Sequence, residues 1–557
     1  MKRNRFVLFG VTIATVFAIA STGATPSQQA YIKPSNTPYV GQFGYATAVS
    51  GDLMVVGAPY ETSTSSGVNG TQSNSFNSAS GAAYVFVRSG TNWVQEAYLK
   101  ASNNSIGSAA QFGFAVALSS NTVVVGAPFE YGSATNVNGD QFNMNTPNSG
   151  AAYVFVRNGT NWSQQAYLKA SNTGNGDNFG TSVSISGDTI IVGAYNEDSN
   201  ATGVNGDQTN NLAGDSGAAY VFERNGTNWS QQAYLKASNT GLANYFGYSV
   251  SVSADTAVVG AWGESSATSD SGAAYIFARS GTNWTQEAYL RASNAGHAGA
   301  NNEFGTSVSV SGDTVAIGAP YESSGSTGVN GNQTNISAFS SGAVYIFVRN
   351  GGAWPQQAYL KASNTGNSDY FGTSVSLSGD TLAVGADGED SNVTGINGDG
   401  ANNASASSGA AYVFTRADSK WSQQAYLKAS NTDINDQFGV SISASGDTVV
   451  VGAFGEDSNA TGVNGNQANN SGSGSGAAYL FAGLGIGPHL SISGDGTGGF
   501  FLQFHGIPDL SYRLQRATNI AGPWDTIDTQ IASPFGIIDY HETTPSPAGA
   551  LYRTIHP

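Results

Sequence analysis

The chain has 557 residues, of which only 10% are charged, against about a quarter in an ordinary soluble protein. Asp and Glu number 37 and Lys and Arg number 20, so the formal charge is -17, which argues against a nucleic-acid partner because phosphate backbones attract basic surfaces. The absence of cysteine excludes disulfides, thiol nucleophiles and thiolate metal sites.

The N-terminus has the pattern of an export signal. Three basic residues in the first five positions precede an apolar run from Phe6 to Ala20, which is typical of a secretory signal peptide cleaved after Ala20 or Ala24. An anchor helix is the alternative, but the run is short for a bilayer span. We predict that residues 1–24 are removed and that the mature protein is secreted or at the cell surface, with no membrane span.

A repeated unit fills most of the remaining chain. The dipeptide Phe-Gly recurs seven times, 58 to 69 residues apart, at Phe43, Phe112, Phe179, Phe246, Phe304, Phe371 and Phe438. Each unit predicts four strands, A to D, which in the third unit are Ser182–Ser186, Thr189–Ala194, Ala218–Arg224 and Gln231–Ala237. Tight Gly-Asp and Asn-Gly turns join A to B and C to D. Seven such sheets bury both faces when they pack around an axis, which predicts an all-β, seven-bladed β-propeller.

The two ends of the repeat region predict a closed ring. The seventh unit reaches its strand C but has no strand D, whereas the segment Gln28–Asn36 matches the strand D of the inner units. An N-terminal strand that completes the last blade removes the unpaired edges of an open solenoid, which is the alternative. We predict that the propeller spans residues 25–487.

The motifs at the strand ends resemble a known family. Phe-Gly at the start of each unit is combined with V-V-G-A-P at Val55–Pro59 and Val124–Pro128 and with A-I-G-A-P at Ala316–Pro320. This combination, over Gln28–Phe481, resembles the FG-GAP repeat family, which includes the ligand-binding propeller of integrin α chains and many bacterial secreted proteins. The resemblance implies a propeller fold, and its function in the family ranges over adhesion, scaffolding and occasional phospholipid hydrolysis.

The chain departs from the integrin pattern at the usual calcium position. Calcium-binding integrin blades carry an Asp-rich loop between strands A and B, whereas this chain has a short Ser-Gly-Asp turn, as at Ser186–Asp188. One carboxylate cannot supply the six to eight oxygens that calcium requires. We therefore interpret the aspartates at this position as turn residues: Asp52, Asp188, Asp313, Asp380 and Asp447.

Strand direction predicts one acidic end. The B–C loops and the D-to-A links share one end of the propeller, contain no Lys or Arg, and hold most of the acidic residues. A glutamate follows strand B in every unit, so symmetry predicts a ring of carboxylates there: Glu61, Glu130, Glu197, Glu264, Glu322, Glu389 and Glu456.

Three interpretations of this acidic end stay open. The first is a solvated rim that keeps the protein in solution. The second is calcium, because three loops share the pattern E-D-S-N-x-T-G-[VI]-N-G-[DN], with oxygen donors at Glu197, Asp198, Asn200, Asn205 and Asp207, at Glu389, Asp390, Asn392, Asn397 and Asp399, and at Glu456, Asp457, Asn459, Asn464 and Asn466. The third is a cationic partner or a glycan.

Little in the sequence indicates catalysis. The propeller contains one histidine, His297, and the other histidines lie in the C-terminal tail without a recognisable triad. Paired carboxylates such as Glu389 and Asp390 could act as acid and base. Catalysis needs one distinctive site, however, and residues that recur in seven units favour structure or multivalent binding.

The recurring aromatic residues of strand D predict packing between blades. They are Trp93, Trp162, Trp229, Trp284, Trp354 and Trp421, each followed five residues later by Tyr98, Tyr167, Tyr234, Tyr289, Tyr359 or Tyr426. Sugar stacking is the alternative. Trp262 differs from them, because it follows strand B in the unit with the shortest B–C loop.

Residues 488–557 lack the repeat and predict a small C-terminal β-sandwich-like module of six or seven strands. Together these patterns predict a secreted, noncatalytic binding, adhesion or surface scaffold that is a monomer and holds an extracellular protein or glycan ligand. The alternative is a secreted propeller enzyme that acts on glycans or phospholipids.

Overall fold

The computed structural model describes residues 26–37, 40–73, 79–104, 109–265, 271–295, 301–417, 419–484, 489–494, 500–505, 511–517, 523–531, 537–542 and 551–555. The predicted export signal and His297 lie outside these residues. The chain forms two compact units, of which one is Thr25–Gly485 and the other includes Ile486–Pro557.

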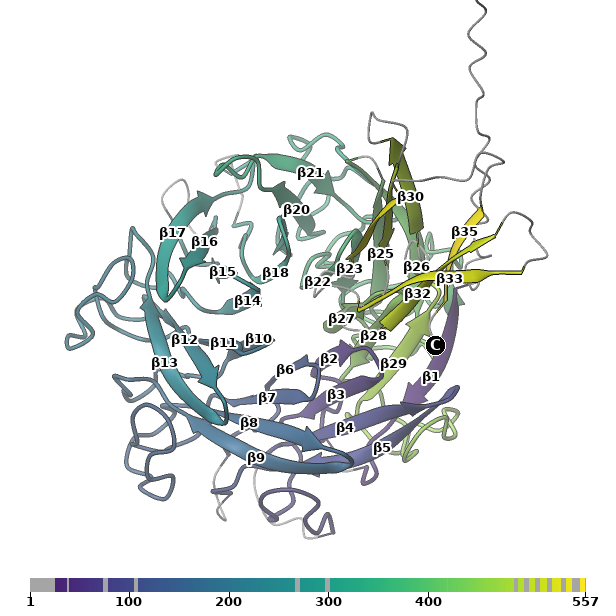
Figure 1. The fold of residues 1–557 in the computed structure, drawn as a ribbon. Coiled ribbons are helices and arrows are strands. Elements are labelled where there is room, and N and C mark those ends of the chain that lie inside the picture. The colour runs from purple at the N-terminus through teal and green to yellow at the C-terminus, as the bar shows by residue number, and fades with distance from the viewer. Residues whose placement is uncertain are drawn as a thin grey trace, which may run out of the picture. The chain divides into compact units, whose positions relative to one another are not determined.

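Thr25–Gly485 is a seven-bladed β-propeller of antiparallel four-stranded blades, as predicted (Figure 1). The innermost strands (A) are β2 (Ala46–Ser50), β6 (Ala115–Ser119), β10 (Ser182–Ser186), β14 (Ser249–Ser253), β18 (Ser307–Ser311), β22 (Ser374–Ser378) and β27 (Ser441–Ser445). The B strands are β3 (Leu53–Ala58), β7 (Thr122–Ala127), β11 (Thr189–Ala194), β15 (Thr256–Ala261), β19 (Thr314–Ala319), β23 (Thr381–Ala386) and β28 (Thr448–Ala453).

The outer half of each blade consists of strands C and D. The C strands are β4 (Ala82–Ser89), β8 (Ala151–Asn158), β12 (Ala218–Asn225), β16 (Ala273–Ser280), β20 (Ala343–Val348), β25 (Ala410–Ala417) and β29 (Ala477–Ala482). The D strands are β5 (Asn92–Leu99), β9 (Asn161–Leu168), β13 (Asn228–Leu235), β17 (Asn283–Leu290), β21 (Gln356–Leu360), β26 (Lys420–Lys428) and β1 (Ser27–Ile32). Blade 6 adds a short strand, β24 (Gly395–Ile396), beside β26.

Serine recurs in the A strands because it links neighbouring blades near the axis. The backbone N–H of Leu377 in β22 donates to Ser309 Oγ in β18 at 2.9 Å, and the N–H of Ala444 in β27 donates to Ser376 Oγ in β22 at 2.9 Å. Strand A is the edge of its sheet, so these bonds satisfy backbone groups that would otherwise be unpaired.

The Phe-Gly motif joins each blade to the one before it. Phe112 at the start of blade 2 is buried, forms a parallel bridge with Gly81 of blade 1, and meets the Tyr153 ring edge-on at 5.3 Å between ring centroids. Gly113 has a φ of +93°, and a Cβ there would lie 2.2 Å from the carbonyl oxygen of Ala82. Only glycine fits this close approach between blades.

The N-terminal strand closes the ring, which confirms the predicted closure. Strand β1 pairs antiparallel with β29, with Ile32 opposite Ala478 and Tyr31 opposite Tyr479, so the last blade has the strand order β1-β29-β28-β27. The core runs between blades as buried Val, Ile, Ala, Phe and Tyr side chains from successive sheets. With β1 as its strand D, the last blade has four strands like the others.

The described part of the C-terminal unit contains six strands in two antiparallel sheets. One sheet has the order β30-β31-β34 and the other β33-β32-β35. The strands are β30 (His489–Gly494), β31 (Phe500–His505), β32 (Ser511–Ala517), β33 (Asp525–Ile531), β34 (Ile537–Glu542) and β35 (Leu551–Ile555). No helix of the described residues is long and apolar enough to cross a bilayer.

Candidate functional site

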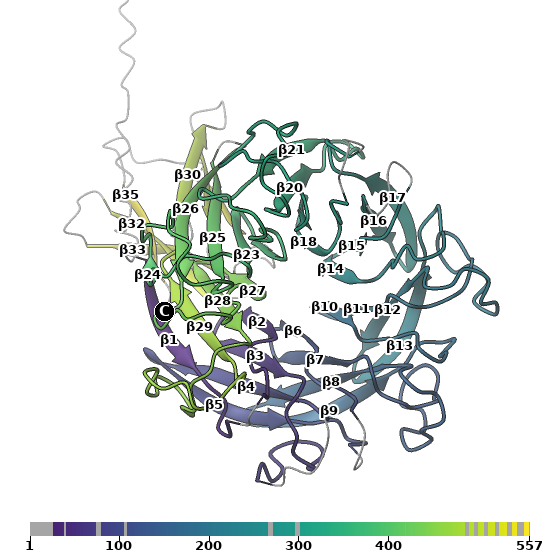
Figure 2. The same cartoon turned by 180° about the vertical axis from the view of Figure 1, so that it is seen from behind.

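The B–C loops and D-to-A links form one end of the propeller, which we call the loop face; the A–B and C–D turns form the turn face. The long B–C loops extend around the ring (Figure 2). The loops and links contain no Lys or Arg. The loops differ in sequence and length between blades, so the loop face is not the same in every blade.

The seven glutamates that follow strand B are buried, so they are not part of a solvated acidic rim, which was one of the three interpretations. Each is only 1–2% exposed. In six blades a lysine at the end of strand D lies 2.7–3.0 Å from the carboxylate, measured from Nζ to Oε2: Lys33, Lys100, Lys169, Lys236, Lys361 and Lys428. In blade 4 the partner is Arg291, at 3.6 Å. Sequence reasoning missed the pairs because five of the lysines are 39 residues from their glutamates and Lys33 is 423 residues from Glu456. Only the blade topology brings the ends of strands B and D together.

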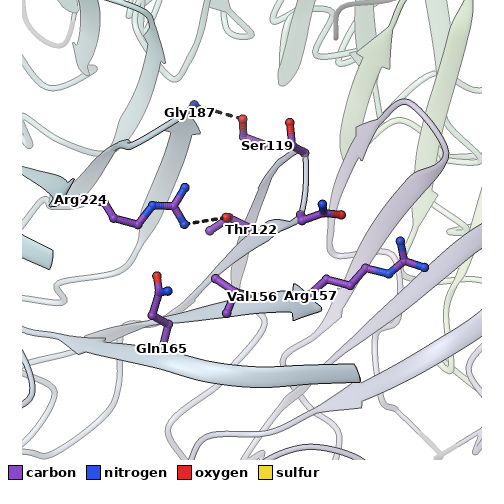
Figure 3. A pocket seen from close by; sticks show the side chains of 9 residues that line it. Ser119, Thr122, Val156, Arg157, Gln165, Gly187 and Arg224 are labelled. Carbon is purple, nitrogen blue, oxygen red and sulfur yellow. Dashed lines mark hydrogen bonds between the residues drawn. The ribbon is translucent and has the colours of Figure 1, made fainter. Parts of the chain in front are cut away.

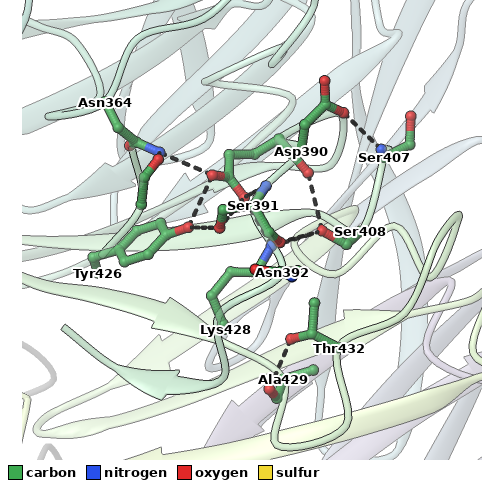
Figure 4. A network of polar contacts seen from close by, with 12 residues as sticks. Asn364, Asp390, Ser391, Asn392, Ser407, Ser408, Tyr426, Lys428, Ala429 and Thr432 are labelled. Carbon is green, nitrogen blue, oxygen red and sulfur yellow. Dashed lines mark hydrogen bonds and ion pairs between the residues drawn. The ribbon is translucent and has the colours of Figure 1, made fainter. Parts of the chain in front are cut away.

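Blade 6 shows how fully each carboxylate is bonded (Figure 4). Lys428 Nζ donates to Glu389 Oε2 and to Ser408 Oγ, both at 2.8 Å. The Tyr426 hydroxyl and the Asn364 amide donate to the other oxygen, Oε1, at 2.9 and 2.8 Å. Burial lowers the pKa of Lys428, and the charge of Glu389 opposes that shift. The network holds the loop, strand D and the preceding link together.

Three of the predicted calcium ligands, Glu197, Glu389 and Glu456, already form an ion pair with a lysine ammonium group. In this arrangement their carboxylates do not fit calcium. The adjacent aspartates instead accept backbone N–H groups within their own loops: Asp198 from Asp215 at 2.8 Å, Asp390 from Ser407 at 2.8 Å and Asp457 from Gly474 at 2.6 Å. The described residues contain no group of three or more His, Cys, Asp or Glu placed to hold a metal ion.

The asparagine and remaining aspartate ligands of the calcium prediction also shape the loops. Asn205, Asn397 and Asn464 have positive φ and accept the backbone N–H of Tyr234, Tyr426 and Tyr31 in strand D, each at 2.9 Å. The backbone N–H groups of Asn200, Asn392 and Asn459 donate to Asn210, Asn402 and Asn469. Asp207, Asp399 and Asn466 accept the N–H two residues later. Calcium binding by the exposed oxygens of these loops stays a prediction.

Three buried aspartates escaped the sequence analysis. Asp177, Asp369 and Asp436 lie two residues before the Phe of the motif and are only 2–3% exposed. Burial raises the pKa to about 7 for Asp177 and Asp369 and to about 8 for Asp436, with nearby carboxylates such as Glu197 and Asp198 adding to the shift of Asp177. The sequence does distinguish these aspartates, because an Asp stands at this position only in the three units that have the E-D-S-N loop.

On the turn face, four of the five aspartates interpreted as turn residues form ion pairs with an arginine at the end of strand C: Asp52, Asp188, Asp313 and Asp380. The fifth, Asp447, accepts the Thr448 hydroxyl. Arg224 lies 2.6 Å from Asp188 and covers the Trp229 ring at 5.1 Å. Blade 2 has Asn121 in place of the aspartate. There Arg157 pairs instead with Glu96 of the preceding blade, at 2.6 Å.

A cavity of about 330 Å³ lies beside this changed turn, between blades 2 and 3 (Figure 3). Its lining includes Thr122, Gln165 and Arg224, and the Arg224 guanidinium donates to Thr122 Oγ1 at 3.1 Å. Asp188 already pairs with Arg224, so the cavity carries little uncompensated charge.

The strand D aromatics pack between blades, as predicted. The six tryptophans are 3–6% exposed, and Trp229 Nε1 donates to Gln165 Oε1 of the preceding blade at 2.8 Å. The tyrosines are buried except Tyr289 in blade 4, which is 38% exposed.

A second set of aromatics does not recur in every blade. These residues stand directly after Phe-Gly or directly after strand B, which places them at the inner edge of the loop face. We call them the aromatic collar: Tyr45, Phe114, Tyr195, Tyr248, Trp262 and Phe454. Sequence reasoning singled out only Trp262, because the other five are single substitutions in an otherwise regular repeat.

Seven segments of the chain match the model of the FG-GAP repeat, at residues 26–86, 93–155, 162–222, 229–277, 284–347, 354–414 and 421–481. No curated protein matches the chain. Each matched segment begins in the strand D of one blade and ends in the strand C of the next, so sequence repeat and blade are offset by one strand. This offset is the reason that β1 completes the last blade. With these segments covering most of its length, the chain belongs to the FG-GAP repeat family.

Proposed function

We propose that the protein is an exported, noncatalytic binding or adhesion scaffold of bacterial type, which works as a monomer and holds an extracellular protein or glycan on its loop face. The FG-GAP propeller fold is consistent with a binding or scaffold role. The export signal in residues 1–24 supports a location outside the cell.

One observation carries the proposal: the polar residues that recur in every blade are bonded inside the blade, whereas the exposed loop residues differ between blades. Glu389, Lys428 and Tyr426 bond to one another and are buried. Exposed side chains such as Phe142, Leu212 and Phe339, which are 70–74% exposed, have no equivalent in every blade. The recurring residues thus support the ring, and the varying loops supply the binding surface.

Loop shortening tests the proposal. Blade 4 shows that the fold accepts a B–C loop of only residues 262–271, compared with residues 195–216 in blade 3. Replacing the long loops one blade at a time with this short loop should lower binding to an array of glycans and matrix proteins, while the melting temperature changes little. Shortening a loop in a distant, nonbinding blade is the matched control.

The enzymatic alternative predicts a different result. A single positioned group would then control turnover of a glycan or phospholipid, and one substitution would remove it by orders of magnitude. We expect no turnover of these substrates. Turnover abolished by one substitution on the loop face would overturn the proposal, as would unchanged binding of every partner after all long loops are shortened.

A further inference from the structure

The aromatic collar combines two arcs of ring contacts at the inner edge of the loop face. In the first arc Tyr45 of blade 1 contacts Phe114 of blade 2 and Phe454 of blade 7, at 4.9 and 5.7 Å between ring centroids. In the second, Tyr248 of blade 4 contacts Tyr195 of blade 3 at 5.6 Å and Trp262 at 6.1 Å. All of these contacts except that between Tyr248 and Trp262 cross a blade boundary, so each arc is a surface that no single repeat contains.

The two arcs belong to different parts of the ring, one to blades 7, 1 and 2 and the other to blades 3 and 4. Burial raises the pKa of Tyr45, and the hydroxyls of Tyr248 and Tyr195 add to that shift although they belong to other blades. The collar rings are only partly buried, and Tyr248 is 36% exposed. Aromatic faces that remain accessible at the centre of a rigid ring are available to a ligand.

Two enclosed polar atoms beside the collar have no hydrogen-bond partner among the described residues. They are the indole Nε1 of Trp262, a donor, and Oδ1 of Asp387, an acceptor. Both residues directly follow strand B, in blades 4 and 6. Enclosed polar groups are rarely left unpaired, so Trp262 Nε1 indicates a missing acceptor and Asp387 Oδ1 a missing donor, although Thr373 already bonds the Asp387 carboxyl group.

Further amides occupy the same inner edge. Gln42, Gln111 and Gln437 stand directly before Phe-Gly. Tyr245 has the same position in blade 4, where its ring stacks on Trp262 with 4.6 Å between the ring centroids. The side chains of these glutamines are half-buried and make no hydrogen bond to any described residue. The collar is thus bordered by groups that can donate and accept.

The geometry points to a binding site at the aromatic collar for a neutral oligosaccharide. Sugar rings present C–H faces that stack on aromatic rings, and their hydroxyls both donate and accept hydrogen bonds, which satisfies Trp262, Asp387 and the glutamines together. The basic residues at the ends of the D strands already pair with the buried glutamates, and beyond them the loops and links supply no Lys or Arg to pair with an acidic sugar. A cationic side chain would use the rings and Asp387 but leave the indole and amide donors unpaired.

This inference rests on the proposed binding role of the loop face and names one site and ligand class within it. The test is isothermal titration of the full mature protein with neutral hexasaccharides: β-1,4-glucan, β-1,3-glucan, β-1,4-xylan and β-1,4-mannan. We expect saturable binding of at least one. Tyr248→Ala and Trp262→Ala should each lower its affinity roughly 3- to 10-fold, the worth of one aromatic contact.

Two kinds of variant separate binding from folding. Val94→Ala removes an exposed apolar side chain from the outer strand β5, away from the loop face, and should leave the affinity unchanged. Trp262→Phe keeps a ring but removes the unpaired indole donor, so it should weaken binding less than Trp262→Ala while the melting temperature stays the same.

Three outcomes would overturn the inference. If none of the four saccharides binds while a protein partner binds the loops, the collar site fails and the proposed function stands. The same holds if Val94→Ala weakens saccharide binding and the collar variants do not. If a lysine- or arginine-bearing peptide displaces the saccharide stoichiometrically and binds more tightly, the collar is a cation site. A separate outcome concerns the proposed function: it fails if shortening the loops leaves the binding of every partner unchanged.

Discussion

At the scale of single residues, the glutamate after strand B is a structural charge. Glu389 is 1% exposed and accepts hydrogen bonds from Lys428, Tyr426 and Asn364. An ion pair removed from water contributes to stability only when both charges are well bonded, and the loss of one partner leaves a costly buried charge. These residues therefore belong to the folding of the blade, not to ligand binding.

Glu389→Gln should destabilise the propeller by about 3–5 kcal/mol, because it leaves the Lys428 ammonium buried without its counter-charge. Blade 4 offers a matched control, since Arg291 there lies 3.6 Å from Glu264 and is 18% exposed. Glu264→Gln should cost about 1 kcal/mol or less. Urea unfolding followed by circular dichroism measures both, and equal losses in the two blades would contradict the argument.

Asp177, Asp369 and Asp436 should make stability fall as pH rises. The folded pKa of each, about 7, 7 and 8, lies above the ordinary value of 3.8, so the stabilising protonated form is fully present below about pH 4 and is lost as pH rises through 7 to 8. The triple Asp→Asn variant should lose this dependence and gain up to about 4 kcal/mol per site at pH 9.

The chain supplies its own control for this prediction. Asn244 and Asn302 occupy the equivalent position in blades 4 and 5 and are buried. Asn302→Asp should introduce the same pH dependence into blade 5. Melting temperatures measured between pH 5.5 and 9 decide the question, and parallel curves for wild type and the triple variant would refute it.

At the scale of the element, β1 has two roles in the last blade. It pairs with β29 along its length, and the residue after it, Lys33, pairs with the buried carboxylate of Glu456 at 2.7 Å. The same segment supplies Tyr31, whose hydroxyl donates to Glu456 Oε1 at 2.7 Å. The segment therefore supplies both the outer strand of the last blade and the partners of its buried carboxylate.

A chain that begins at Thr37 should therefore melt at a much lower temperature than one that begins at Ser27, because it loses both the strand and the partner of Glu456. A peptide of residues 26–36 added in solution should restore the melting temperature in proportion to its concentration. The same peptide with Lys33→Glu should not restore it. Equal melting temperatures for the two chains would show that β1 does not close the ring.

At the scale of the whole molecule, the propeller keeps its recurring residues inside and presents different loops around one rim. The formal charge of -17 overstates the exposed acidity of that rim, since the seven glutamates are paired with strand D. The remaining acidic groups include Asp198 and Asp207, which shape the loop through backbone hydrogen bonds. Calcium binding is the other role proposed for these aspartates, and the effect of calcium on the melting temperature tests it.

The backbone N–H groups that Asp198, Asp390 and Asp457 accept need no metal, so if these bonds alone shape the loops, chelation of calcium should leave the melting temperature unchanged. Metal analysis of the purified protein and thermal melts with and without calcium measure this. A calcium-dependent rise in melting temperature that disappears in the triple Asp→Ala variant of these three residues would instead show that the loops bind calcium.

Local periodicity and turn chemistry determined the blades, because strand alternation and Gly-Asp turns act over a few residues. The recurrence of Phe-Gly and the missing last strand D similarly predicted seven blades and closure by residues 28–36. Whether a charged side chain is exposed or buried in an ion pair was decided by the tertiary structure. Glu197 looked exposed because it follows a strand at the start of a polar loop, yet Lys236 lies 2.8 Å away once the blade forms. The aromatic collar likewise arises from single residues of blades 1, 2, 3, 4 and 7 that converge only when the ring closes, since no local pattern records which residues of different repeats will meet around a common axis.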